Sequence, residues 1–85
     1  MKPGDVVIVT QLSKDGEREW RWFGVITRIP KKGRWIELWR LGDWERKVTI
    51  RANDNNFHVL EEDKWPDGVW ALRTRAILEG KIEIL

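Results

Sequence analysis

The chain has 85 residues, of which 35% are charged, and a formal net charge of +2, so it has the size of one small domain spanning residues 1–85. It contains no cysteine, which excludes disulfides and thiolate metal sites. No long apolar run and no signal-peptide pattern occurs, so we expect no membrane span and a location in the cytoplasm, or inside a host cell for a virus product. Abundant charge with one glutamine is typical of a thermophile, although Asn53, Asn55 and Asn56 argue against it.

The first half of the chain shows four strand patterns separated by turn residues. A β-branched run predicts a strand over 5–12, and the polar loop 13–17 contains a turn signal at Asp15-Gly16. A second strand is predicted over 18–29, with a bulge or sharp bend at Gly24. Proline and glycine at the ends of 30–33 indicate a hairpin tip, which is followed by strands over 34–41 and 44–51.

The second half of the chain is less regular. We expect a loop over 53–56, a strand over 57–60, an acidic loop over 61–63 and a turn over 65–68. Residues 69–78 fit either a strand or a helix between Asp67 and Gly80, and we favour the strand because a helix would place Arg73 in the apolar arc. The alternation in 81–85 predicts a last strand.

Short strands joined by tight turns predict an all-β fold, either a small barrel or a strongly bent antiparallel sheet of five to seven strands. The run KPGDVVIV at 2–9, where Gly-Asp starts the first strand, and the aromatic-rich WFGVITRI at 22–29 resemble the opening of SH3-like small barrels of the Tudor and KOW type, a likeness that spans residues 1–41. The resemblance implies that the expected barrel is a small SH3-like barrel. It implies a module that binds nucleic acid, modified side chains or protein segments without catalysis.

The pairing of strands 34–41 and 44–51 has two alternatives. A two-residue turn at 42–43, which turn propensity favours, places Trp35 and Trp39 on the apolar face with Val48 and Ile50. An odd-numbered loop over 42–44 with one bulged residue instead pairs Ile36 with Ile50, and it turns both tryptophans toward cationic partners on the other face. The pairs formed on that face are then Trp39 with Lys47 and Trp35 with Arg51.

Seven tryptophans exceed what the core of so small a domain can absorb, so we expect several at the surface. Residues 1–51 carry a charge of +5 and residues 52–85 a charge of −3, which predicts a basic face. The hairpin tip 30–33 concentrates cations beside an indole, a composition suited to phosphate contacts and base stacking. The candidate nucleic-acid-binding residues are Arg28, Lys31, Lys32, Arg34, Trp35, Trp39, Lys47 and Arg51.

The sequence contains no pattern that supports catalysis, metal binding or a cofactor site. His58 and Ser13 are the single histidine and serine, and nothing in the pattern brings them together. The acidic run 61–63 lacks spaced partners for a metal, and Asp54 lacks the spacing of a calcium loop. We therefore expect a non-enzymatic binding module for nucleic acid. The alternative is a viral or accessory module that binds a protein, or a second copy of itself, through exposed tryptophan and arginine.

Overall fold

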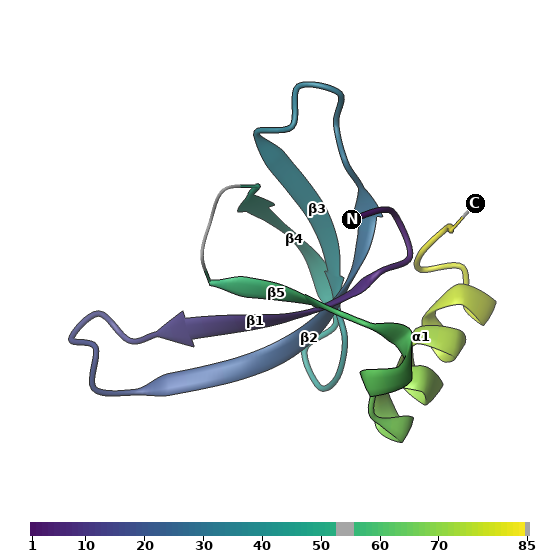
Figure 1. Ribbon diagram of the computed structural model, residues 1–85. Coiled ribbons are helices and arrows are strands. Elements are labelled where there is room, and N and C mark those ends of the chain that lie inside the picture. Colours follow the sequence, from purple (N-terminus) through teal and green to yellow (C-terminus); the bar gives the residue numbers. More distant parts are fainter. Residues whose placement is uncertain (53–55, 85) are drawn as a thin grey trace.

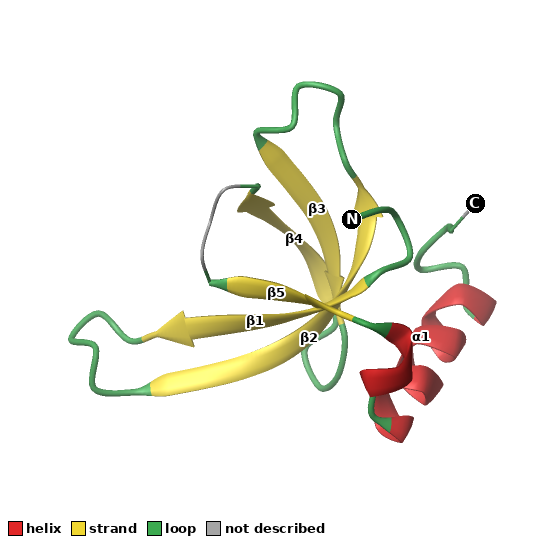
Figure 2. Cartoon of the chain, viewed as in Figure 1, coloured by secondary structure: helices red, strands yellow, loops and turns green. Residues whose placement is uncertain are grey.

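The computed structural model describes residues 1–52 and 56–84. In this part of the chain five strands form one antiparallel sheet in the order β4-β3-β2-β1-β5. The strands are β1 (Val6–Leu12), β2 (Glu19–Arg28), β3 (Trp35–Arg40), β4 (Arg46–Arg51) and β5 (Phe57–Leu60). A short 3-10 helix, η1 (Glu62–Lys64), and one α-helix, α1 (Asp67–Leu78), follow them (Figures 1 and 2). The all-β prediction is confirmed in its bent-sheet form, because β4 and β5 both remain edges and the sheet does not close into a barrel.

The sheet is buried on both faces. We call the face that carries Val6 and Val25 the helix face, because α1 and the tail after it cover it through Val69, Ala76 and Ile82. The opposite, inner face carries the second cluster, which is Val7, Val9, Trp22, Ile26, Ile36 and Leu38. Figure 1 shows β3 and β4 rising at an angle from β1 and β5, so the sheet bends around this second cluster.

The β3–β4 hairpin adopts the register that turn propensity disfavoured. Ile36 pairs with Ile50, and a five-residue loop over 41–45 joins the strands in place of the expected two-residue turn. The reason lies in packing, because this register buries Ile36 and Leu38 completely on the inner face. The two-residue turn would have placed both of these aliphatic side chains on the opposite face from Val48.

Residues 67–78 form a helix, so the expected strand at 69–78 was wrong. The helix ends in a Schellman motif, in which Lys81 N–H donates to the Ala76 carbonyl at 3.0 Å and Gly80 adopts a φ of 73°. Arg73 does lie on the inward side of the helix, but its guanidinium has interaction partners there. Its Nε donates to the Gly4 carbonyl at 3.2 Å, and its guanidinium lies 5.1 Å from the Trp65 ring centroid.

Two smaller expectations also change. Residues 81–84 form no strand, and they pack Ile82 and Ile84 against the helix-face cluster instead. The irregularity in β2 lies between Ile26 and Arg28, whereas pairing at Gly24 is regular on both sides. Expectations on Asp54 and the rest of 53–55, and on residue 85, lie outside the described residues. Within the described ranges, no helix is long and apolar enough to cross a membrane.

Candidate functional site

The tryptophans divide between core and surface. Trp22 is 5% exposed, and Trp39 and Trp65 are half-buried against the apolar clusters. The remaining four have substantial exposure and are Trp20, Trp35, Trp44 and Trp70. The expectation that several indoles reach the surface is therefore confirmed.

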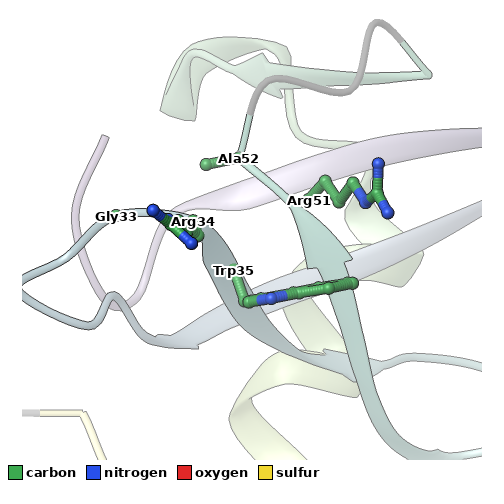
Figure 3. A pocket seen from close by; sticks show the side chains of 5 residues that line it. All are labelled: Gly33, Arg34, Trp35, Arg51 and Ala52. Atoms are coloured by element: carbon green, nitrogen blue, oxygen red, sulfur yellow. The ribbon is translucent and has the colours of Figure 1, made fainter.

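The β3–β4 register brings Trp35 and Arg51 together. The two residues are direct cross-strand partners, and the guanidinium carbon of Arg51 lies 5.5 Å from the centroid of the Trp35 ring. The indole is 49% exposed. At this distance the cation and the ring attract each other, which holds both side chains on one side of the hairpin. Figure 3 shows them extending side by side from β3 and β4.

A pocket of about 640 Å³ opens beside this pair. Its lining includes Gly33 and Arg34 from the loop before β3 and Ala52 from the end of β4 (Figure 3). The backbone N–H of Ala52 donates to the Arg34 carbonyl at 3.0 Å, which fixes the two chain segments across the pocket. The pocket therefore combines an open indole face with two guanidinium groups on a hydrogen-bonded frame.

The basic loop between β2 and β3 adds positive charge next to this pocket. Arg28, Lys31, Lys32 and Arg34 are all exposed. None of them, nor Arg51, forms an ion pair with a carboxylate in the described part of the chain. The described residues thus do not neutralise these charges, which favours the approach of an anion.

Two of the candidate residues are placed elsewhere. Trp39 packs half-buried against the helix-face cluster with its indole Nε1 buried, and it lies outside the Trp35–Arg51 pocket. Together with Arg28 and Lys47 it lines a separate hollow on the sheet. Lys47, its cross-strand partner, lies 3.5 Å from the Glu37 carboxylate. Thr27 donates a hydrogen bond to the same carboxylate group at 3.0 Å. Lys47 is therefore occupied within the sheet.

Known proteins provide no further information on this site. No family model, no curated protein and no solved structure matches the chain.

Sequence reasoning missed a second group of aromatic and cationic side chains, around Arg40 at the other end of β3. The guanidinium carbon of Arg40 lies 5.2 Å from the Trp22 ring centroid and 5.9 Å from that of Trp44. The signal that could have found it is Trp44 itself, because a large indole within a turn segment has no strand face to bury it.

Glu45, the last residue of the loop that carries Trp44, connects this loop to the C-terminal part of the chain. Its carboxylate accepts hydrogen bonds from Arg75 at 3.1 Å and from Lys81 at 3.0 Å. The Lys81 hydrogen bond, followed by that of Arg75, lowers the pKa of Glu45 despite partial burial, which acts in the opposite direction. Glu45 thus connects the loop to α1 and to the tail.

Proposed function

We propose that this protein is a non-catalytic module that binds single-stranded nucleic acid at the Trp35–Arg51 pocket. The observation that supports this best is an indole half-exposed beside a guanidinium at 5.5 Å, with nearby cations that form no ion pair among the described residues. A base would stack on the free surface of Trp35 while its neighbouring phosphates contact Arg34 and Arg51. Lys31, Lys32 and Arg28 would guide the backbone toward the pocket.

A single strand fits this arrangement better than a duplex. An indole can stack only on a base that has left its own stack, which a single strand provides without unpairing. The pocket lies beside the loop that joins β2 and β3. We further propose that the bent sheet is a relative of the SH3-like small barrels, in which loops between strands contact the ligand.

The proposal predicts a modest and salt-sensitive affinity. About five cations lie near the pocket, so the logarithm of the binding constant should fall with the logarithm of salt concentration with a slope of about −3 to −4. Stacking of one base on Trp35 should contribute about 1–3 kcal/mol. Sequence preference should be weak, because an indole stacks on any base.

Fluorescence anisotropy of a labelled oligothymidylate of about 10 nucleotides tests the proposal. Trp35→Ala should weaken binding by about 5- to 150-fold, the equivalent of 1–3 kcal/mol. Trp20→Ala is the matched control, because Trp20 has a similar exposure of 47% and lies on a different hairpin. Arg51→Gln should weaken binding and make the salt slope shallower by about 0.7.

The proposal fails if the oligonucleotide does not bind at low salt. It also fails if the Trp35→Ala and Trp20→Ala variants bind equally well while both remain folded by circular dichroism. Preferential binding of the corresponding duplex would contradict the single-strand assignment.

A further inference from the structure

Arg40 is a cation whose donors are not used by the described part of the chain. It lies on the inner face of β3, within cation–π distance of both Trp22 and Trp44. These indoles displace water from parts of the guanidinium, which strengthens its interaction with an anion. No hydrogen bond or ion pair within residues 1–52 and 56–84 uses its N–H groups. The guanidinium is thus held in place by aromatic contacts while its planar donor set stays open.

A second arginine stands directly opposite. Arg46 is the cross-strand partner of Arg40, and partners in antiparallel strands project to the same face with their Cβ atoms about 5 Å apart. Like charges at such positions repel each other. The neighbouring Glu45 carboxylate does not compensate them, because it is engaged by Arg75 and Lys81. The described chain therefore holds two adjacent positive charges without a counter-charge in contact.

Arg40 borders an aromatic hollow of about 510 Å³, and Arg46 lies next to it as the cross-strand partner of Arg40. Its lining includes the indoles of Trp20, Trp22 and Trp44 together with Arg40. Trp44 is 69% exposed and Trp20 47%, so the rings present large apolar surfaces to a ligand. The indole N–H of Trp22 is buried and has no acceptor among the described residues. The hollow therefore offers apolar contact area beside the Arg40 guanidinium, and Arg46 is the cross-strand neighbour of that arginine.

We propose that this hollow is a docking site for a protein partner that presents two neighbouring carboxylates next to a large apolar side chain. The carboxylates would accept paired hydrogen bonds from Arg40 and Arg46, because the guanidinium fork matches the two oxygens of a carboxylate. The apolar side chain would pack between Trp20 and Trp44. Tryptophan and arginine are the residue types that contribute most binding energy at protein interfaces.

The charges around the hollow favour an acidic peptide over nucleic acid. A phosphate backbone requires a line of free cations along its path. Here Arg21, which also lines the hollow, is paired with Glu19 at 3.2 Å, and Asp43 adds a negative charge to the lining. The positive charge is thus confined to one pair of side chains, which suits a compact acidic cluster.

The docking site is separate from the Trp35–Arg51 pocket. Trp35 and Arg40 lie at opposite ends of β3, about 17 Å apart along the strand. They also project from opposite faces, since one pairs with Arg51 on the helix face and the other with Arg46 on the inner face. The inference does not depend on the proposed nucleic-acid function, and either one can fail alone.

Nuclear magnetic resonance of the full chain tests the docking site through the seven indole N–H signals, assigned with single Trp→Phe variants. The probe is a capped heptapeptide with two adjacent glutamates flanked by leucines, and its control carries glutamines instead. The glutamate peptide should shift the signals of Trp44 and Trp20 and leave Trp35 unchanged. Arg46→Gln and Arg40→Gln should each weaken binding by about tenfold or more. Arg34→Gln, on the far pocket, should leave it unchanged.

Several results would overturn the inference. One is the absence of any shift at Trp44 with the glutamate peptide at about 1 mM, the affinity range of weak peptide contacts. Equal binding of the glutamine peptide would also overturn it, because the arginines would then have no role. Displacement of the peptide from Trp44 by the oligothymidylate would also overturn it, because nucleic acid would then be the ligand of the hollow. A dimer that appears in sedimentation and that Trp44→Ala abolishes would show that a second copy of the chain binds there instead.

Discussion

Substitution of Gly24 by alanine should destabilise the protein, although the same change in an open strand position is favourable. Gly24 lies in the middle of β2, between β1 and β3. A Cβ atom built there would lie 3.0 Å from Cζ3 of Trp22 and 3.4 Å from the backbone oxygen of Trp39. Carbon atoms in good contact are separated by about 3.5–4.0 Å, so the indole has to move by about half an ångström.

The indole has little freedom to make this movement. Trp22 is 5% exposed within the inner-face cluster, and the Arg40 guanidinium lies 5.2 Å from its ring centroid. Overpacking in such a site costs about 1–3 kcal/mol, whereas replacing glycine in a strand returns about 0.5–1 kcal/mol. The free energy of unfolding should therefore fall by about 1–2 kcal/mol. For a domain of this size the melting temperature should fall by roughly 5–15 °C.

Urea and thermal unfolding followed by far-ultraviolet circular dichroism measure this change. Gly68→Ala is the matched control, because beyond its chain neighbours and the backbone of α1 itself nothing lies within 4 Å of its Cβ position in the first turn of this helix. It should raise stability by about 0.5–1 kcal/mol. In a Trp22→Phe background, which lacks the indole six-membered ring, Gly24→Ala should become close to neutral. If Gly24→Ala stabilises the wild-type protein as Gly68→Ala does, the packing argument is wrong.

Three further substitutions test other parts of the fold. Glu45→Gln should lower stability at neutral pH by about 1 kcal/mol. Because hydrogen bonds from Lys81 and Arg75 lower the folded pKa of Glu45 below 4.5, its stabilisation is complete above that pH and is lost as the pH falls through the folded value. The difference between wild type and variant in a pH series of urea unfolding should therefore vanish in acid. Arg46→Gln should raise the free energy of unfolding by about 0.2–1 kcal/mol at low salt, because it removes the repulsion between Arg46 and Arg40. In thermal unfolding this gain should become smaller as salt is added. Arg73→Met keeps the aliphatic packing but leaves the Gly4 carbonyl without its donor. This substitution should lower the free energy of unfolding in urea by about 1–2 kcal/mol. An unchanged urea midpoint would show that the hydrogen bond does not hold α1 to the sheet.

The sequence by itself determined the five strands of the sheet and their approximate ends, although it also predicted strands at 69–78 and over 81–84 that do not form. The predicted strand 57–60 coincides with β5, and the predictions 5–12 and 18–29 differ from β1 and β2 by one residue at each changed end. These elements follow from β-branched runs bounded by turn residues, which are local signals. The surplus of indoles at the surface was equally predictable, because it follows from the composition and the size of the domain.

The tertiary structure alone decided the register of the β3–β4 hairpin, and with it the candidate site. Both registers place apolar side chains together, so the alternation along the strands could not distinguish them. The choice depended on what lies against each face, which for Ile36 and Leu38 is the bent sheet itself. That choice turned Trp35 toward Arg51 and left Trp39 under the chain that covers the helix face.

The helix α1 was decided in the same way. Its capping glycine was visible in the sequence, but Arg73 in the apolar arc argued for a strand. The carbonyl that satisfies Arg73 belongs to Gly4, at the other end of the chain. A local pattern contains no information on a partner so distant in sequence, because only the folded sheet brings the two segments together.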